Sequence, residues 1–491
     1  MEAGAHWDRV VEPAAREKRR RWLFHPSASQ LPAAGSGLCE WVSARIWQIF
    51  YSGTPVATIW IRERRMSVGT LYDLVVIGGG PAGVTAACLA QKMGKRAACV
   101  ETAVSLGAAA STSVRCVPTK SMCYNTHLFD MFRVRAGGVE YEFQLTAGAD
   151  LLRGPAKIEG PHEVRTADGV VRAEYVIVCT GSDSVDLPFL KFDHRVVLNS
   201  TSCMELKTTP KTLGIIGAGA IGLELGSVWS RLGTRVTLLE ALPHVGSEAC
   251  DPELAGELQR HLECKGVTFT LGVKVVAADG ETHSVDFEKV LVSVGRRAQT
   301  VSLGLDAIGV QVDRKMCVVT DPSTSRSVTC DWVYAAGDCA PGPAIAHKAT
   351  YESIRAVRAM FAGEVSEDAV TVLESLPCVV YTQPELAWAG RTEDELCASG
   401  EDVEVHRLRF NGDMRDTLCP RLEGLAKVVV NRKTRRLRSV WLLGATAGDI
   451  VAEAVTAIRG GLTVDQWGNV PHAHPFYKSL HTMLVLGIEG W

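Results

Sequence analysis

The sequence predicts an α/β fold built around two Rossmann-like units, each a parallel sheet covered by helices. Two observations carry this prediction. An apolar strand, a G-x-G-x-x-G turn and a helix follow one another shortly after residue 70, and the same succession recurs shortly after residue 210. The chain of 491 residues has room for both units and a further domain, because single domains usually hold about 100–200 residues.

The first unit begins with an apolar run at Leu74–Ile77, typical of a buried parallel strand, and continues into a helical pattern over residues 84–92. Its fingerprint glycines are Gly78, Gly80 and Gly83. The first permits a tight turn, the second lets the backbone approach a pyrophosphate, and the third lets the helix pack on the strand. The next strand, over residues 96–100, leads to Glu101, whose carboxylate would meet a ribose hydroxyl. The unit therefore predicts a nucleotide site with its phosphates at a helix N-terminus.

The second unit repeats this order with strands at Leu213–Ile216 and Arg235–Leu239. Its fingerprint glycines are Gly217, Gly219 and Gly222. Glu240 closes the second strand, where an acid bonds the ribose 2′-hydroxyl and repels a 2′-phosphate. The unit therefore favours NAD(H) over NADP(H). Two units in one chain indicate two nucleotides, one of which could be a tightly held flavin.

Composition narrows the function classes. A net charge of −3 gives no electrostatic argument for binding nucleic acid or an anionic membrane surface. The 15 cysteines have no disulfide-framework spacing, which indicates reduced thiols in an intracellular compartment. We therefore expect no nucleic-acid partner, no membrane partner and no metal site.

The first 69 residues differ from the rest and form an N-terminal extension, 1–69. Its aromatic run, Trp41–Ile61, contains Arg45 and Pro55, which argues against a bilayer span. Acidic residues near its start are the wrong composition for an import peptide. Met66 stands a few residues before the first strand. One interpretation makes Met66 the true start, and the other has the whole extension translated.

Further segments indicate what the two sites are for. Val176–Ser182 reads V-I-V-C-T-G-S, Val333–Asp338 reads V-Y-A-A-G-D, Ala344–Ala349 reads A-I-A-H-K-A, and Cys116–Lys120 reads C-V-P-T-K. In this order and spacing, the set resembles the flavin-dependent pyridine-nucleotide disulfide oxidoreductases. It is most similar to their dihydrolipoamide dehydrogenase subgroup, the E3 component of 2-oxoacid dehydrogenase complexes. The motifs that indicate the subgroup are Gly217–Leu239, Pro243–Gly246, Val294–Arg297, Tyr381–Glu385 and His472–Pro475.

The resemblance implies two cofactor sites and a catalytic histidine. The residues that it assigns to FAD are Gly78, Gly80, Gly83, Glu101, Lys120, Thr180, Gly181, Ser182, Asp338, Ala344, Ile345, Ala346 and His347. Those that it assigns to NAD(H) are Gly217, Gly219, Gly222, Glu224, Glu240, Val275 and Gly295. By this resemblance, Lys120 would approach the flavin ring, Asp338 would bind the ribitol, and His474 would act as the acid/base on the partner subunit's site.

The resemblance also implies the domain order. It predicts two Rossmann-like, three-layer ββα nucleotide-binding domains and an α+β dimerisation domain. Their ranges would be FAD-binding at 70–205 and 331–375, NAD-binding at 206–330, and dimerisation at 376–491. Because a histidine from each subunit would complete the other's site, a two-fold homodimer is implied. A lipoyl domain of a 2-oxoacid dehydrogenase complex is the implied partner, and the mitochondrial matrix or the cytoplasm is the implied location.

The family's disulfide chemistry needs two cysteines spaced C-x-x-x-x-C, and this chain has only one of them. Cys116 holds the flavin-side position, while the partner position is Ser111. A hydroxyl cannot form a disulfide or exchange thiols. If the segment is helical, Cys123 cannot replace it. At about 1.5 Å rise per residue its Cα would lie roughly 10 Å from that of Cys116, whereas bridged Cα atoms lie within about 7 Å.

Two more positions depart from the family. The acid that orients the catalytic histidine should lie five residues after His474, and that position is Ser479. Without it, the imidazole loses the partner that would fix its tautomer. The stretch His127–Gly137 is shorter than in the family, which would remove part of the wall over FAD and weaken flavin retention.

A shift of reading frame is one hypothesis for the lost thiol. Ala110–Ser113 reads A-S-T-S. The family's C-V-N-V, with assumed codons TGC GTC AAC GTC, gives this sequence when it is read one base later. A compensated frameshift between Gly107 and Arg115 would then hide an ordinary cysteine. The alternative is a true serine codon, which resequencing of the locus would reveal.

Three functions follow from these observations. The first is oxidation of dihydrolipoamide by NAD⁺ through FAD, which requires a second active-site cysteine. The second is a single-thiol diaphorase, in which NADH reduces FAD and the electrons leave to a quinone, a dye or oxygen. The third is a catalytically silent E3-like subunit. Bound flavin, dye reduction and lipoamide turnover discriminate between them.

Overall fold

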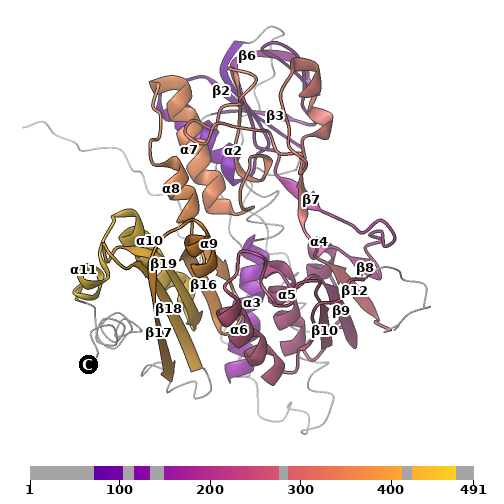
Figure 1. Ribbon diagram of the computed structural model, residues 1–491. Helices are drawn as coiled ribbons and strands as arrows, with labels where there is room; N and C mark the ends of the chain where they lie inside the picture. The colour runs from indigo at the N-terminus through magenta and orange to yellow at the C-terminus, as the bar shows by residue number, and fades with distance from the viewer. Residues whose placement is uncertain (1–70, 103–115, 133–148, 276–285, 412–422, 472–491) are drawn as a thin grey trace, which may run out of the picture.

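The computed structural model describes residues 71–102, 116–132, 149–275, 286–411 and 423–471, and they form three domains (Figure 1). The first domain occupies the top of the view, the second the lower right, and the C-terminal domain the lower left. The predicted α/β class, with two Rossmann-like domains and an α+β C-terminal domain, is confirmed.

The first domain is built on one sheet with a parallel part and an antiparallel part. Its strands in sheet order are β3 (Asp150–Arg153), β2 (Ala97–Glu101), β1 (Leu71–Ile77), β6 (Gly169–Val178), β5 (Glu163–Thr166) and β4 (Lys157–Gly160), and β14 (Val333–Ala335) pairs in parallel with β6. Helices α2 (Pro81–Lys92) and α7 (Ala346–Ala362) pack together over one face. This arrangement explains the continuous apolar run of β1, because both of its faces are buried. Helices cover one face, and side chains of the antiparallel strands β4–β6 pack against the other.

The second domain has a five-stranded, fully parallel sheet. Its strands in sheet order are β11 (Thr268–Thr270), β10 (Arg235–Leu239), β9 (Thr212–Ile216), β12 (Lys289–Val292) and β8 (Val197–Leu198). Its helices are α4 (Ser200–Met204), α5 (Ala220–Arg231) and α6 (Pro252–Cys264). Helix α3 (Cys116–Phe132) comes from the first domain's part of the sequence but packs against α5.

Two short antiparallel strands connect these domains. They are β7 (Ser182–Ser184) and β13 (Arg296–Ala298), and the turns η3 (Val301–Leu303) and η4 (Asp306–Ile308) follow. Leu303, Leu305, Val310 and Val318 belong to the core of the first domain. Conversely, β8 pairs with β12 in the second domain, and Cys203 of α4 is part of that domain's core.

The structure therefore corrects two predicted domain boundaries. The range 70–205 is too long, because residues 197–204 contribute a strand and a helix to the second domain. The range 206–330 is also too long, because residues 303–318 pack under the first domain's sheet. Both errors have one physical cause. Strand pairing and side-chain packing between distant segments leave no local signal in the sequence.

The third domain is an antiparallel sheet with helices. Its strands in sheet order are β15 (Cys378–Val380), β16 (Glu385–Gly390), β19 (Leu437–Gly444), β18 (Glu423–Asn431) and β17 (Val403–Asn411). Its helices are α9 (Glu393–Ala398), α10 (Ala447–Arg459) and α11 (Val464–Gly468), and α8 (Ala369–Glu374) precedes it in the chain. Helix α10 packs on β16 and β19. Trp441 and Leu443 of β19 lie in one cluster with the second domain's core, so the two domains share packed side chains.

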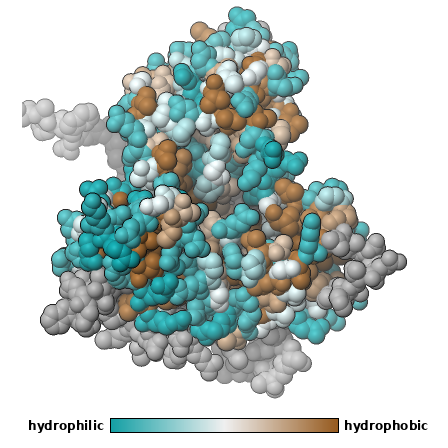
Figure 2. All heavy atoms as spheres, viewed as in Figure 1, coloured by the Kyte–Doolittle hydropathy of each residue, from teal (hydrophilic) through white to brown (hydrophobic). Residues whose placement is uncertain are grey.

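On the face shown in Figure 2, hydrophobic residues occur in several separate groups among hydrophilic ones. Such mixing is ordinary, since more than half of a folded protein's accessible surface is apolar. Within the described ranges, no helix has the length and apolar character needed to cross a bilayer.

A buried ion-pair network joins the second and third domains. Lys427 of β18 has a side chain that is only 5% exposed, and its Nζ lies 2.7 Å from Asp251, 3.0 Å from Glu393 and 3.8 Å from Glu253. Asp251 also caps α6, because its Oδ1 accepts from the backbone N–H groups of Glu253 and Leu254. Removal of Lys427 would therefore leave the buried carboxylate of Asp251 without its cationic partner at the domain junction.

We predict that Lys427→Met lowers the free energy of unfolding by about 3 kcal/mol, because breaking a buried pair leaves an uncompensated charge. Urea denaturation at neutral pH measures the loss. Arg432→Met is the matched control, since the Arg432–Asp402 pair is exposed and should contribute less than about 1 kcal/mol. Equal effects of the two substitutions would refute the prediction.

Candidate active site

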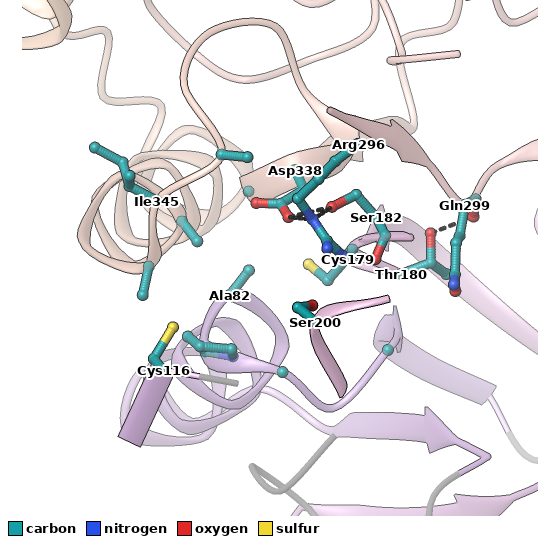
Figure 3. A pocket seen from close by; sticks show the side chains of 18 of the residues that line it. Ala82, Cys116, Cys179, Thr180, Ser182, Ser200, Arg296, Gln299, Asp338 and Ile345 are labelled. Atoms are coloured by element: carbon teal, nitrogen blue, oxygen red, sulfur yellow. Dashed lines mark hydrogen bonds and ion pairs between the residues drawn. The ribbon is translucent and has the colours of Figure 1, made fainter. Parts of the chain in front are cut away.

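A cavity of about 1290 Å³ lies where the three domains meet. Its walls come from the β1–α2 turn, the start of α3, the ends of β2 and β6, the η5 turn (Gly337–Cys339), the starts of α5 and α7, and β15. Figure 3 shows Cys116 and Ile345 on one side of it, and Thr180, Ser182, Arg296 and Gln299 on the other. The cavity is thus long enough to touch both Rossmann-like units.

The first phosphate-binding turn has the conformation that its glycines require. Gly78 has φ +106°, and a Cβ there would collide with the carbonyl oxygen of Cys179. A Cβ at Gly83 would collide with the carbonyl of Gly78. At Gly80, by contrast, no protein atom lies within 4 Å of where a Cβ would be. The space before Gly80 opens into the cavity, which is what close approach of a phosphate needs.

The second turn repeats this geometry. Gly217 has φ +100°, and a Cβ there would lie 2.6 Å from the carbonyl oxygen of Ser293. Gly222 packs on the carbonyl of Gly217, while a Cβ at Gly219 would meet only the Gly246 oxygen, at 3.5 Å. Helices α2 and α5 begin at Gly80 and Gly219, and no side chain caps either N-terminus. Both helix ends therefore fit an anionic group.

An acid holds each turn in the same way. The Oε2 atom of Glu101 accepts from the N–H of Gly79 at 2.7 Å, and the Oε2 atom of Glu240 accepts from the N–H of Ala218 at 2.6 Å. Glu240 also accepts from the N–H of Leu242 at 2.9 Å. The two predicted ribose-binding acids thus lie beside their turns. Glu101 lines the cavity and is buried.

Asp338 lies in the η5 turn and faces the cavity. Its Oδ2 accepts from the hydroxyl of Ser182 at 2.5 Å, and the Nε of Arg296 lies 3.9 Å from it. Arg296 also donates to the hydroxyl of Ser182 at 2.7 Å and to its backbone carbonyl. These contacts hold the carboxylate at the wall that Figure 3 shows, where a hydroxylated ligand could donate to it.

Lys120 and Glu224 form an ion pair inside the cavity. The Nζ of Lys120 donates to both carboxylate oxygens of Glu224, at 2.7 and 2.6 Å, and the N–H of Tyr381 donates to the same carboxylate at 3.0 Å. Burial alone would lower the pKa of Lys120, but the Glu224 carboxylate outweighs it and the pKa is raised. Lys120 therefore stays cationic at neutral pH.

Glu224, which the sequence assigns to the NAD(H) site, thus contacts Lys120, which the sequence assigns to the FAD site. Glu224 lies one helical turn inside α5, and its side chain is only 3% exposed. It points toward α3 and lines the cavity that also contains Lys120. The packing of α3 on α5 brings this residue of the second unit's helix to Lys120, and its assignment to NAD(H) stays a prediction.

The thiol side of the site contains Cys116 but not Cys123. The segment from Cys116 to Phe132 is helical, which meets the condition set for the separation of Cys116 and Cys123. Cys116 begins this helix, is exposed and lines the cavity, whereas Cys123 is buried between α3 and α5. Burial, with the nearby Glu224 carboxylate adding to it, raises the pKa of the Cys123 thiol to about 12.

The remaining predicted residues fall into three groups. Those that line the cavity are Thr180, Gly181, Ala344, Ile345, Ala346 and His347. Val275 and Gly295 belong to the second domain's loops, where Gly295 has φ +140° and accepts from the N–H of Val185. Ser111, His474 and Ser479 lie outside the described residues.

Cys179, Arg296, Gln299 and Tyr381 are among the cavity-lining residues to which the sequence gave no role. The hydroxyl of Thr180 donates to the carbonyl of Gln299 at 2.6 Å, and the Nζ of Lys120 lies 4.8 Å from the centre of the Tyr381 ring. Arg296 and Tyr381 stand in motifs that were used only to recognise the subgroup. Their presence in these motifs was the sequence signal that could have identified them as site residues.

A cavity with one phosphate-binding turn in its wall, the start of the second unit's helix α5, a fixed cation and a thiol fits a redox enzyme that uses two nucleotides. Residues 72–353 match the family described as pyridine nucleotide-disulphide oxidoreductase, and residues 376–484 match the dimerisation domain of that name. The chain belongs to the pyridine nucleotide-disulphide oxidoreductase family. This family uses FAD and a pyridine nucleotide, and the dimerisation domain supports a homodimer.

Similar proteins cover most of the chain. Mitochondrial dihydrolipoyl dehydrogenase of Caenorhabditis elegans is 33% identical over 450 residues, covering 82% of this chain and 90% of its own. Leghemoglobin reductase of Vigna unguiculata is 33% identical over 451 residues, covering 82% and 85%. The solved structure of the HOCl-induced flavoprotein disulfide reductase RclA from Escherichia coli shares the fold, with TM-score 0.72, 23% identity, and coverage of 84% and 99%.

We predict that Gly80→Ala and Gly219→Ala act separately on the two nucleotides. A methyl group at Gly80 meets no protein atom, so the fold should persist, while FAD affinity falls about tenfold or more because the phosphate loses its close approach. Gly219→Ala should weaken NADH in the same way and leave FAD unchanged. Absorbance of bound flavin and NADH titration measure the two effects. Wild-type FAD affinity in Gly80→Ala would contradict this account.

We predict that iodoacetamide at pH 8 modifies Cys116 and spares Cys123. With a pKa of about 12, Cys123 is ionised in roughly one molecule in ten thousand at that pH. Peptide mass spectrometry follows each thiol, and the exposed Cys264 gives the rate of an accessible thiol away from the cavity. Modification of Cys123 as fast as Cys264 would show that α3 opens and that Cys123 is available for exchange.

Proposed function

We propose that this protein is an FAD-dependent NAD(H) oxidoreductase of the dihydrolipoyl dehydrogenase type. In our proposal it retains electron transfer between NADH and FAD and has lost exchange with a dithiol at Ser111. The observation that carries the proposal is the single cavity that reaches from the Gly80 turn to Ala220 and Ile221 at the start of α5. A nucleotide on each turn would extend into the same space.

The choice of NAD(H) over NADP(H) rests on Glu240. Its carboxylate lies beside the second turn, held by the N–H groups of Ala218 and Leu242. A carboxylate there suits a ribose 2′-hydroxyl and repels a 2′-phosphate.

The residues at the centre of the cavity support the transfer step. Bound FAD supplies the chemistry, because it accepts a hydride from NADH and passes the electrons on. Lys120 provides a positive charge that Glu224 keeps in place, and such a charge stabilises negative charge that develops nearby. Asp338 is positioned to accept a hydrogen bond from a hydroxylated cofactor chain.

The exit of electrons is where this chain departs from dihydrolipoyl dehydrogenase. Cys116 is available at the cavity wall, but Ser111 cannot form the disulfide or attack one. Cys123 is buried and cannot take its place. We therefore propose a quinone, a dye or oxygen as the acceptor. Without an acid at Ser479, His474 would also be a weaker base than in the family.

Two other functions depend on specific observations. If the Gly107–Arg115 segment hides a cysteine through a frameshift, the protein is a complete dihydrolipoyl dehydrogenase, and a lipoyl domain of a 2-oxoacid dehydrogenase complex is its partner. If the short segment near His127–Gly137 abolishes flavin binding, it is a silent E3-like subunit. A mitochondrial matrix or cytoplasmic location suits all three functions.

We predict that the purified dimer contains FAD, reduces ferricyanide or menadione with NADH, and does not oxidise dihydrolipoamide with NAD⁺. Ser111→Cys should add dihydrolipoamide oxidation, because it restores the thiol pair with Cys116. The double variant Ser111→Cys with Cys116→Ser is the control and should lack it. Lipoamide turnover by the protein with Ser111 would disprove the proposed loss, and protein without flavin would favour the silent subunit.

A further inference from the structure

A fully buried lysine and a buried glutamate lie one helical turn apart on α7, beneath the η5 turn. The side chain of Lys348 is 0% exposed and that of Glu352 is 3% exposed, and Nζ lies 3.0 Å from Oε2. Burial of two charges is costly unless each also makes further hydrogen bonds. Here both side chains bind the backbone of one residue, Gly337.

The pair holds Gly337 from both sides. The N–H of Gly337 donates to Oε2 of Glu352 at 2.8 Å, and its carbonyl accepts from Nζ of Lys348 at 2.9 Å. Lys348 also donates to the carbonyl of Ala340 at 3.3 Å. Gly337 has φ +78° and no side chain of its own, so these bonds, together with that from the N–H of Ala340 to its carbonyl, fix its place in the turn.

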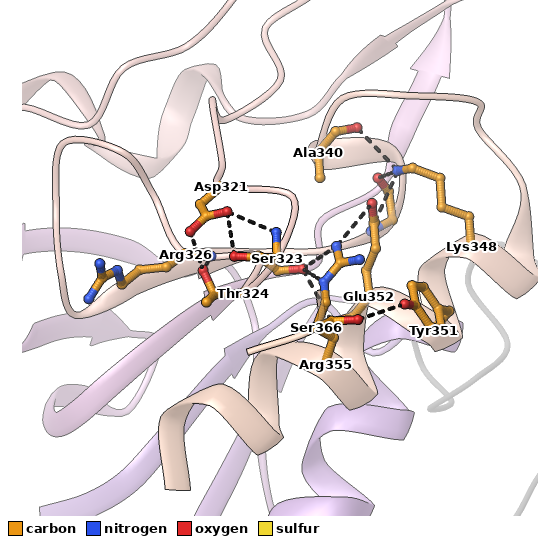
Figure 4. A network of polar contacts seen from close by, with 12 residues as sticks. Asp321, Ser323, Thr324, Arg326, Ala340, Lys348, Tyr351, Glu352, Arg355 and Ser366 are labelled. Atoms are coloured by element: carbon orange, nitrogen blue, oxygen red, sulfur yellow. Dashed lines mark hydrogen bonds and ion pairs between the residues drawn. The ribbon is translucent and has the colours of Figure 1, made fainter. Parts of the chain in front are cut away.

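A second cation holds the glutamate in place. Arg355 lies one further turn along α7, with its Nη2 atom 3.9 Å from Oε1 of Glu352. Its Nη2 and Nε also donate to the hydroxyl of Ser325, at 2.8 and 3.2 Å. Figure 4 shows Arg355, Glu352, Lys348 and Ala340 together in this network. Glu352 is therefore fixed by neighbours on two sides.

The segment between the two held carbonyls contains Asp338. Gly337 and Ala340 are both bonded to Lys348, and Asp338 lies between them with its carboxylate at the cavity wall. Ser182 and Arg296 hold the carboxylate from the cavity side. The backbone that carries Asp338 is held from two sides. Lys348 and Glu352 of α7 bind Gly337 and Ala340 at its ends. On the other side, the thiol of Cys317 donates to the carbonyl of Asp338 at 3.6 Å, and the N–H of Val318 donates to that of Cys339 at 2.8 Å.

We propose that Lys348 and Glu352 are positioning residues for FAD, because they fix the η5 turn so that the Asp338 carboxylate points into the cavity. The proposal rests on the predicted role of Asp338 as an FAD ligand. It does not depend on which acceptor the enzyme uses.

The test separates FAD affinity from stability. Lys348→Met and Glu352→Leu should each destabilise the FAD-free protein and weaken FAD binding about tenfold or more, because each strands a buried charge. Combined in one chain, they remove both charges, so the thermal midpoint of the FAD-free protein should recover part of the loss. FAD affinity should stay low, because Gly337 has lost both of its side-chain partners.

Controls and a conservative variant sharpen the test. Arg358 and Glu364 form an exposed ion pair at the end of the same helix, so Arg358→Met with Glu364→Leu should change neither quantity. Glu352→Gln keeps an oxygen for the N–H of Gly337 and should lose less FAD affinity than Glu352→Leu. Asp338→Asn should weaken FAD and leave the FAD-free midpoint unchanged.

Two results would overturn the proposal. If FAD affinity recovers together with stability in the double variant, the pair is structural and does not position Asp338. If Asp338→Asn binds FAD as tightly as the wild type, the turn has no ligand to position. Neither result bears on NADH oxidation with ferricyanide, which tests the proposed function separately.

Discussion

Lys120 and Glu224 form the ion pair on which the arrangement of the cavity depends, because it joins helices from two domains and the backbone of a third. Lys120 comes from α3, Glu224 from α5, and the N–H of Tyr381 precedes β16. Glu224 is buried, so it must keep these donors or leave a charge stranded in the core. The pair thus requires the three domains to meet at one place, and that place is the cavity wall.

The two nucleotide turns show how one local structure serves two ligands. Glu101 and Glu240 each accept from the N–H that follows the first glycine of their fingerprint. The surroundings differ, because Gly80 opens into a cavity walled by η5 and α7, whereas Gly219 faces the loop of Gly246. Local sequence specifies a phosphate turn, and the neighbouring elements determine which cofactor can extend from it.

This chain keeps the residues expected for electron transfer from NADH to FAD, but it lacks one of the residues that the family uses to pass electrons on to a disulfide. The entry side has both turns, a fixed cation and a carboxylate at the cavity wall. The exit side has Cys116, and α3 places Cys123 in the core, where its high pKa keeps it protonated. A thiol cannot be replaced by a nearby cysteine on the same helix, since helical geometry fixes their separation. The family's dithiol step therefore depends on the residue at position 111.

The sequence alone determined the local features: the strands β9 and β10 to within a residue, the glycine turns, the acids that close them, and the helix that begins at Cys116. These follow from periodicity and backbone sterics, which act over a few residues. Only the tertiary structure decided that Glu224 serves Lys120, that β8 pairs in the second sheet, and that Lys348 and Glu352 support Asp338. Each depends on packing between segments far apart in the chain, for which local sequence carries no signal.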